Sequence, residues 1–331
     1  MQYPLISEYV KASQDVSDNL DMSTEATNAE LNEAITDEFG VEYSKDRRKL
    51  LKAPQKLDGT YSIKEGVRII CNSAFFGCEF LSSVVIPDSV TSIGYSAFCY
   101  CSALRSLVLP DSVTSIGNGA FGDCYSLDSL IIPDGVTCIG DNTFMGCTSL
   151  SNLVLPNSIT CIGNSAFQGC KSLSSLVIPE SVVSIGHGAF RGCSSLTSLV
   201  IPDSVTSIGD CAFDGCKSLN SVVIPDSVTS IGKGAFLWCS SLSKIVIPSS
   251  VTSIGNGAFN ECDSLRSVVI SDGVTSIWDS AFFCCVSLSE IVIPSSVTSI
   301  GDCAFGGCSS LTCLVIPDSV TSIGDNAFGG V

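Results

Sequence analysis

Basic residues are scarce in this chain of 331 residues. Lysine and arginine together number 16, against 33 aspartates and glutamates, and the formal net charge is -17. Because binding to a phosphate backbone needs a concentrated positive surface, this composition excludes nucleic acid as an expected partner. We interpret the acidic surface as one that keeps an elongated molecule in solution.

Long apolar runs and reactive motifs are also missing. No run approaches the roughly 18 apolar residues of a membrane-spanning helix, and the chain does not start with the basic and apolar stretches of a signal peptide. There is no glycine-rich phosphate loop with its lysine, and the single histidine, His187, has no triad partners around it and is expected to be an exposed spacer. We therefore expect no membrane span, no cofactor and no enzymatic activity.

A period of 23 residues organises the chain from about Lys64 to Val331. Repeats of this length indicate a solenoid, because one such unit cannot bury its own apolar face whereas stacked units can. The phenylalanine column marks about twelve coils, of which the first and last are incomplete. It runs, without insertion or deletion, through Phe75, Phe98, Phe121, Phe144, Phe167, Phe190, Phe213, Phe236, Phe259, Phe282, Phe305 and Phe328.

Each coil follows the approximate pattern LxxLVIPDSVTSIGxxAFxGCxS. The β-branched run Val84 to Ile86, closed by Pro87, predicts a short strand, and Val90 to Ile93 predicts a second, shorter one. The Ala-Phe-x-x-Cys segment is too short for an independent helix and predicts one helical or 3₁₀ turn. At the roughly 4.8 Å spacing of neighbouring strands, the stacked coils should bury a continuous core about 55 Å long.

The phrase IPDSVTSIGDCAFDGCKSL, residues 201–219, recurs with small changes and resembles the BspA-like, or Treponema pallidum type, leucine-rich repeats over roughly four fifths of the chain. The commoner leucine-rich pattern has Asn or Cys at a ladder position where this chain has Ser89, Ser112 and Ser181. The resemblance implies an α/β repeat solenoid, right-handed, with a short-stranded parallel sheet on one face. It also implies adhesion or protein recognition, and no catalytic residues.

Two segments precede the repeats at 64–331. Residues 1–40 predict a helical cap or arm with two short amphipathic helices, the second after a Thr27–Glu30 capping box and stopped by Gly40. Their apolar faces carry Leu5, Tyr9, Ala12, Val16 and Leu20, and then Leu31, Ala34, Ile35 and Phe39. Residues 41–63 predict a β-hairpin with a polar turn and a degenerate first repeat. A cap over the open end of the solenoid is favoured over a partner-binding arm.

Cysteine is abundant, and eleven of the 19 form an inward column. Side chains of neighbouring coils would point in parallel there, which is poor geometry for bridging, so we expect free thiols that act as small apolar residues. Cys138 and Cys161, in adjacent coils, would form either a bridge or an exposed thiol pair. The column consists of Cys78, Cys101, Cys124, Cys147, Cys170, Cys193, Cys216, Cys239, Cys262, Cys285 and Cys308.

Cysteine pairs could suggest a zinc site and the aspartates after the prolines a calcium site, but we expect neither. Cys99-x-Cys101 and Cys284-Cys285 resemble zinc spacing only in part, because one member of each pair belongs to the buried column. The aspartates that follow the proline column could stack into a calcium ladder. However, Asn157, Glu180 and Ser249 interrupt the column, and Pro-Asp is ordinary turn chemistry.

The predicted strands also define an outward column. If Val84 and Ile86 point inward, alternation sends Val85 outward, together with the matching residue of every later coil. Strand propensity alone would explain such a stripe, but a continuous apolar patch also marks a contact surface. The column continues through Val108, Ile131, Val154, Val177, Val200, Val223, Val246, Val269, Val292 and Val315.

Large side chains also occur just after the phenylalanine of a few coils, where most coils have small or polar residues. Aromatic residues are enriched in binding hot spots and in sugar-stacking surfaces, so these are our candidate partner-binding residues, with filling of local gaps as the alternative. Trp278 replaces a recurring glycine and is expected to extend the second group. The candidates are Phe76, Phe80, Tyr100 and Tyr125, and then Leu237, Trp238, Trp278 and Phe283.

These observations favour a non-catalytic solenoid for protein–protein interaction or adhesion, with a host protein or another copy of the chain as partner. A carbohydrate-binding module that uses the exposed aromatics is the alternative. The missing signal peptide and the unpaired thiols favour the cytoplasm, whereas the family resemblance favours the cell surface or secretion after removal of a leader. The identity of the ligand and the oligomeric state stay open.

Overall fold

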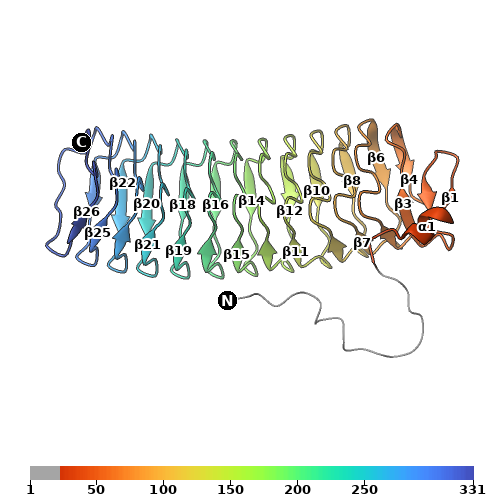
Figure 1. Ribbon diagram of the computed structural model, residues 1–331, viewed down its shortest axis with the longest axis horizontal. Helices are drawn as coiled ribbons and strands as arrows, with labels where there is room; N and C mark the ends of the chain where they lie inside the picture. Colours follow the sequence, from red (N-terminus) through yellow and green to blue (C-terminus); the bar gives the residue numbers. More distant parts are fainter. Residues whose placement is uncertain (1–22) are drawn as a thin grey trace, which may run out of the picture.

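The computed structural model describes residues 23–331, which form one long stack of parallel coils (Figure 1). All coils but the last contribute two strands, and most strands pair in parallel with the strand 23 residues away in the next coil, as in Val177↔Val200 and Ser184↔Ser207. This confirms the predicted solenoid and its period. The sequence specifies this register because a shift by one residue would turn every inward side chain outward.

The first strands of the coils line one face of the stack, here called the valine face. They form three consecutive parallel sheets, in the orders β12-β10-β8-β6-β4, β14-β16-β18 and β20-β22-β24. Their bounds are β4 (Gly59–Ser62), β6 (Leu81–Val85), β8 (Ser106–Val108), β10 (Ser129–Ile131), β12 (Asn152–Val154), β14 (Ser175–Val177), β16 (Ser198–Val200), β18 (Ser221–Val223), β20 (Lys244–Ile247), β22 (Ser267–Ile270) and β24 (Glu290–Val292).

The second strands are shorter and line another face, here called the serine face. Each begins with Ser or Cys, or with Ile in β5, and spans two residues, as predicted from the run Val90 to Ile93. Their bounds are β5 (Ile69–Ile70), β7 (Ser92–Ile93), β9 (Ser115–Ile116), β11 (Cys138–Ile139), β13 (Cys161–Ile162), β15 (Ser184–Ile185), β17 (Ser207–Ile208), β19 (Ser230–Ile231), β21 (Ser253–Ile254), β23 (Ser276–Ile277), β25 (Ser299–Ile300) and β26 (Ser322–Ile323).

The phenylalanine column forms the centre of the core. From Phe75 to Phe328 each ring stacks on the next at 4.9–5.6 Å between centroids, with planes inclined by 1–16°. The rings from Phe75 to Phe305 are fully buried. This ladder explains why phenylalanine recurs without a gap, since an identical ring in the next coil fills each layer.

Two polar ladders connect the coils beside this core. In nine coils a serine of the Pro-x-Ser-Val turn donates its hydroxyl to a backbone carbonyl 22 residues earlier, at 2.5–2.8 Å, as Ser181 does to Ile159. In ten coils the column cysteine donates its thiol to the phenylalanine carbonyl 26 residues earlier, at 3.1–3.2 Å, as Cys193 does to Phe167. Both residue types therefore satisfy carbonyls that the turns leave facing the next coil.

Helix is almost absent from the described residues. The Ala-Phe-x-x-Cys segment, expected as a helical or 3₁₀ turn, is instead a series of hydrogen-bonded turns interrupted by left-handed residues such as Ser96 (φ 50°) and Tyr100 (φ 61°). A left-handed residue reverses the path of the chain and cannot continue a helix. The solenoid is therefore built from strands and turns, and α1 (Asn28–Asn32) is the one helix assigned in residues 23–331.

The segment before the repeats only partly follows the prediction. The Thr27–Glu30 capping box is present at α1, but the helix stops at Asn32 and the chain continues as β1 (Ile35–Thr36). The oxygen Oδ1 of Asp37 accepts the backbone N–H groups of Phe39 and Val41 at 2.9 Å, which forms a tight turn that the expected helix would not allow. The first expected helix, with Leu5 to Leu20, lies outside the described residues.

The expected apolar face of the second helix is consequently not buried, since Leu31, Ile35 and Phe39 are all exposed. The predicted hairpin is confirmed: β2 (Glu42–Tyr43) pairs antiparallel with β3 (Lys49–Lys52). β1 extends it on one side, and β5 extends it in parallel on the other. The hairpin thus continues directly into the serine face of the solenoid.

Candidate interaction surface

The outward column of the valine face is exposed along the solenoid. Its eleven side chains, from Val85 to Val315, are between 50% and 83% accessible, whereas the residues before and after each of them are more buried, with Leu107 at 4% and Leu109 at 6% around Val108. The predicted aliphatic stripe is therefore present, and the strand alternation explains it. Serines such as Ser106 and Ser129, two positions earlier, are exposed beside it.

The aromatic candidates lie at a different edge, on the turns that follow the buried phenylalanines. Every coil there has a residue with positive φ, between 55° and 77°, which is glycine in seven coils and Tyr100, Asp123, Trp238, Glu261 or Cys284 in the others. Side chains larger than hydrogen are disfavoured in this conformation. Tyr100 and Trp238 are therefore large aromatic residues at a position where the local backbone favours glycine.

The first aromatic group forms a groove of about 470 Å³ at the start of the solenoid. Phe76 and Tyr100 meet edge to face at 5.5 Å between ring centroids, and Phe80 completes the apolar side of the groove. Gln55, Lys56 and Glu79 line the rest. The structure thus brings together three of the four early candidates.

Tyr125, the fourth early candidate, lies in the next coil near Asp123. The charge of the Asp123 carboxylate raises the pKa of Tyr100. Burial raises the pKa of Tyr125, and the Asp123 carboxylate raises it further. The first groove therefore extends to an acidic group that sequence reasoning did not single out.

The second group centres on Trp238, which is 46% exposed. Lys217, Ser240, Glu261 and Asp263 surround it in a groove of about 360 Å³. These four residues belong to the same turns in the neighbouring coils, at offsets of -21, +2, +23 and +25 from the tryptophan. Sequence reasoning missed the charged ones, although aligning the turns by the 23-residue period would have placed them beside Trp238.

The remaining later candidates do not share one surface with Trp238. Leu237 and Phe283 are only half exposed, and the Phe283 ring lies against the next coil, 3.1 Å from where a side chain on Gly306 would begin. Trp278 is 52% exposed but directly follows β23, at the other end of the turn. Within residues 23–331, no ring contact joins Trp278 or Phe283 to Trp238. The expected extension of the patch through Trp278 therefore stays a prediction without a supporting contact.

Trp278 also shows why its column is glycine in all the other coils except at Cys71. The glycines there have ordinary φ values, but a Cβ on Gly301 would lie 2.5 Å from the backbone nitrogen of Asp279. The requirement is thus close approach of two coils and not positive φ. At Trp278 the hydrogen bond from its N–H to the Ile254 carbonyl is 3.2 Å long, compared with 2.8 Å for Gly301.

Replacing Trp238 with glycine is expected to give a protein about 1 kcal/mol more stable than replacing it with alanine, because both remove the ring but only glycine is unstrained at φ 57°. Urea unfolding followed by circular dichroism measures the difference. Tyr95 is exposed and lacks a positive φ, so the order of the two substitutions should reverse there. The same order at both positions would contradict the strain argument.

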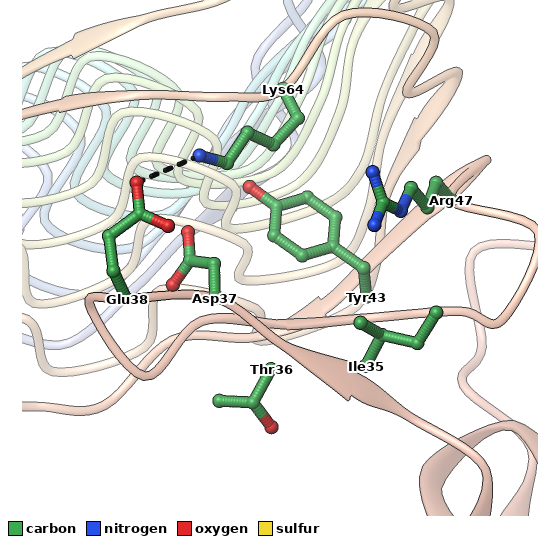
Figure 2. Close-up of a pocket in the computed structure, with 7 residues that line it drawn as sticks. All are labelled: Ile35, Thr36, Asp37, Glu38, Tyr43, Arg47 and Lys64. Carbon is green, nitrogen blue, oxygen red and sulfur yellow. Dashed lines mark hydrogen bonds and ion pairs between the residues drawn. The ribbon is translucent and has the colours of Figure 1, made fainter.

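The hairpin and the first coil line a further cavity, of about 330 Å³, and most of the polar groups around it have partners (Figure 2). Tyr43 and Tyr61 share a short hydrogen bond between their hydroxyls, and the Tyr61 hydroxyl donates to Asp37 Oδ2 at 2.7 Å. Burial raises the pKa of both phenols, and at Tyr61 these hydrogen bonds raise it further. Lys64 pairs with Glu38 at 3.0 Å. This network ties the β1–β2 turn to the first coil.

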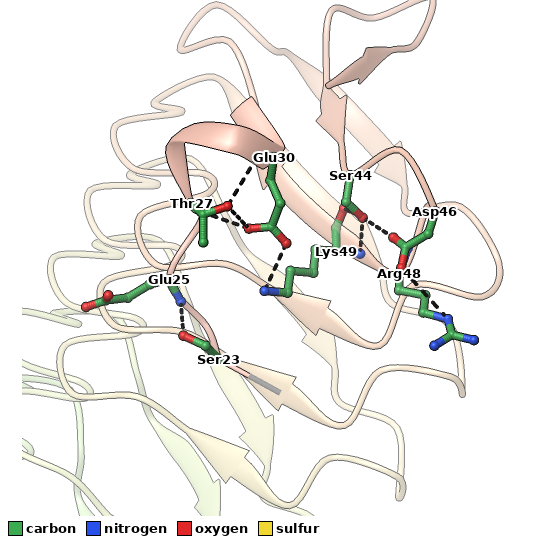
Figure 3. A network of polar contacts seen from close by, with 8 residues as sticks. All are labelled: Ser23, Glu25, Thr27, Glu30, Ser44, Asp46, Arg48 and Lys49. Carbon is green, nitrogen blue, oxygen red and sulfur yellow. Dashed lines mark hydrogen bonds and ion pairs between the residues drawn. The ribbon is translucent and has the colours of Figure 1, made fainter. Parts of the chain in front are cut away.

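Three of the four basic residues at 45–49 lie near acidic side chains, and Figure 3 shows this for Arg48 and Lys49. Lys49 is buried and contacts Glu30 at 3.0 Å, and Glu30 also accepts the Thr27 N–H of the capping box. Lys45 pairs with Glu33 at 3.1 Å. These contacts fix α1 to β3 and to the turn before it.

The cysteine column carries free thiols, as predicted. Burial raises their pKa, to about 12 for Cys193, and each thiol is occupied by a carbonyl. Because such thiols are inert, they do not report on the redox state of the compartment. Cys138 and Cys161, left open by the sequence, form a disulfide between β11 and β13.

The described part of the chain contains neither a cluster of metal ligands nor a membrane-spanning helix. No three His, Cys, Asp or Glu side chains of residues 23–331 come together as metal ligands. Over the same residues, no helix has the length and apolar character needed to cross a membrane. His187 is exposed, and its Nδ1 accepts the Asp210 backbone N–H at 3.1 Å, which makes it part of a ladder between coils.

The family model described as "BspA type Leucine rich repeat region (6 copies)" matches residues 68–197, 160–288 and 229–331. The chain belongs to the BspA-type leucine-rich repeat proteins. The matched ranges include the valine face from β6 onward and both aromatic grooves except for the residues before Arg68. The BspA-type resemblance expected from the phrase at 201–219 is therefore confirmed.

Solved structures of leucine-rich repeat proteins are similar to this chain. A leucine-rich repeat protein from Bacteroides ovatus is 31% identical, with a TM-score of 0.78 over 90% of this chain and 83% of that one. A leucine rich cell surface protein from Faecalibacterium prausnitzii is 30% identical, with a TM-score of 0.52 over 90% of this chain and 98% of that one. A protein from Eubacterium ventriosum, 24% identical with a TM-score of 0.52, shares the fold. No curated protein matches the chain.

Proposed function

We propose that this BspA-type solenoid is a non-catalytic scaffold that binds a partner protein through its valine face, in adhesion or a related form of recognition. The observation that carries the proposal is the exposed aliphatic column from Val85 to Val315. Monomeric soluble proteins rarely expose so continuous an apolar surface, because it costs free energy in water. A partner that covered the column would remove that cost.

The geometry of the face suits a protein partner more than a small ligand. The column follows parallel strands in register, so its side chains form a straight row and not a pocket. Exposed serine hydroxyls beside the row offer hydrogen bonds at its margin, similar to the apolar centre and polar rim of protein interfaces. The related Faecalibacterium prausnitzii protein is described as a cell surface protein, which is consistent with a role in adhesion.

Replacing Val177, Val200 and Val223 together with threonine is expected to weaken partner binding at least tenfold. Threonine keeps the β-branched shape of the strand residue but places a hydroxyl where an apolar contact is required. Proteins captured from surface and lysate fractions of the source organism by the wild-type chain can be compared with those captured by the triple variant, and their affinities measured by titration.

Val183→Thr is the matched control. Val183 is 51% exposed but lies outside the column, at a position where most coils have threonine. The control should capture the same proteins as the wild-type chain. If the triple variant also captures them with unchanged affinity, the valine face is not the binding surface.

A further inference from the structure

The two aromatic grooves share one chemistry. In each, an exposed aromatic ring at a left-handed turn position, Tyr100 or Trp238, is accompanied by two carboxylates and one lysine. Glu79 and Lys56 line the first groove, and Asp123 occupies the position of Tyr100 in the next coil, one period of 23 residues later. Glu261, Asp263 and Lys217 line the second groove. Each groove therefore has an excess of one negative charge beside an aromatic face.

An aromatic ring beside carboxylates is suited to binding the cationic side chain of arginine or lysine. The face of an aromatic ring attracts a guanidinium or ammonium group, and arginine both stacks on such a ring and forms hydrogen bonds to a carboxylate. The net charge of -17 adds a long-range attraction for basic segments. The carboxylates can accept hydrogen bonds from the hydroxyls of a neutral sugar, but only a cation also gains from their charge, which favours a basic ligand over a neutral sugar.

The two grooves are also in register with each other. Tyr100 and Trp238 are 138 residues apart, which is six periods of 23. Adjacent coils are 5.0 Å apart at Cys138 and Cys161, so the rings lie about 30 Å apart along the same edge at the strand spacing of a sheet. An extended peptide rises about 3.3 Å per residue and would cover this distance in roughly nine residues.

The residues between the two grooves restrict where a ligand can carry positive charge. Arg191 lies there and pairs with the buried carboxylate of Asp214 at 2.8 Å, and Lys171 is exposed on the same turns. These cations disfavour basic ligand residues in the middle. The ligand should therefore carry its positive charges in two clusters separated by a neutral spacer.

We propose that the two grooves form a bipartite site for an extended segment of a partner protein that carries two arginine clusters about nine residues apart. The proposal rests on the proposed function in that the partner is a protein, but it uses a different surface from the valine face. Binding at both grooves would make the second contact intramolecular, which raises the overall affinity without any further contact.

Isothermal titration with a synthetic peptide tests the site. The probe has Arg-Gly-Arg at each end of a spacer of nine glycines and serines, and a second peptide carries citrulline, a neutral isostere, in place of each arginine. The arginine peptide should bind the wild-type chain and lose affinity as salt rises, and the citrulline peptide should bind at least tenfold more weakly. Equal binding of both peptides would overturn the proposal.

Tyr100→Gly and Trp238→Gly are the informative variants, because glycine is the residue that most coils have at this position, and we expect both variants to keep the fold. Each should weaken binding of the arginine peptide at least tenfold. Tyr95→Asn is the control: it removes an exposed aromatic outside both grooves and restores the asparagine of Asn72, Asn118 and Asn164. Unchanged binding by both glycine variants, or binding of neutral oligosaccharides but not of the arginine peptide, would refute the bipartite site.

The valine-face variant separates this proposal from the proposed function. The triple Val→Thr variant should still bind the arginine peptide but should no longer bind the partner protein that the wild-type chain captures. If the wild-type chain does not bind the peptide while the triple variant still loses its partner, the bipartite site is refuted and the valine face stands.

Discussion

Replacing Phe190 with alanine is expected to lower the free energy of unfolding by about 3–5 kcal/mol, the usual cost of removing a buried phenylalanine ring. Phe190 is fully buried, and its ring stacks on Phe167 at 5.3 Å and on Phe213 at 5.4 Å. The substitution leaves a cavity between two rigid layers that cannot collapse, because each coil is held in place by its hydrogen-bonded neighbours. Urea unfolding measures the loss.

Phe328→Ala is the matched control for this prediction. It makes the same change in the same column, but Phe328 is only partly buried and stacks on one ring, Phe305, at 5.6 Å. Its cost should be less than half that of Phe190→Ala. Equal losses at the two positions would show that the stacked ladder does not carry the stability ascribed to it.

Replacing both Cys138 and Cys161 with serine is expected to lower the free energy of unfolding by about 3 kcal/mol. The disulfide closes a loop with a sequence separation of 23 residues, and a cross-link of this length restricts the unfolded chain by about that amount. Serine is the residue at the same position in most other coils, as in Ser115 and Ser184. The double variant therefore removes the cross-link without introducing a residue foreign to the strand.

Unfolding with and without dithiothreitol measures this contribution. The reductant should lower the stability of the wild-type chain to that of the double variant and leave the variant unchanged. Because the variant keeps the other cysteines, a similar loss in both proteins would assign the effect to those thiols and not to the bridge. If the disulfide of the wild-type chain is fully reduced and the free energy of unfolding does not fall, the predicted contribution of the bridge is refuted.

The 23-residue period explains why so much of the fold could be predicted from the sequence. When a unit repeats without insertion, residues at the same phase share the same environment, so one coil predicts the others. The burial of Phe190, the inward thiol of Cys193 and the outward side chain of Val200 all follow from this rule. It fails outside the repeats: Ile35 and Phe39 continue the helical period of Leu31, but the Asp37 turn and the pairing of Ile35 with Tyr43 place these two residues in strand and turn.

The sequence by itself thus determined the number of coils, the core columns, the valine face and the family. Only the tertiary structure decided that Tyr100 and Trp238 stand at left-handed turn positions, that charged residues of neighbouring coils surround Trp238, and that Cys138 and Cys161 are bridged. The physical reason is that a repeat pattern specifies the direction in which each side chain points. It does not specify backbone φ or the distances between side chains of successive coils, which depend on how the turns pack.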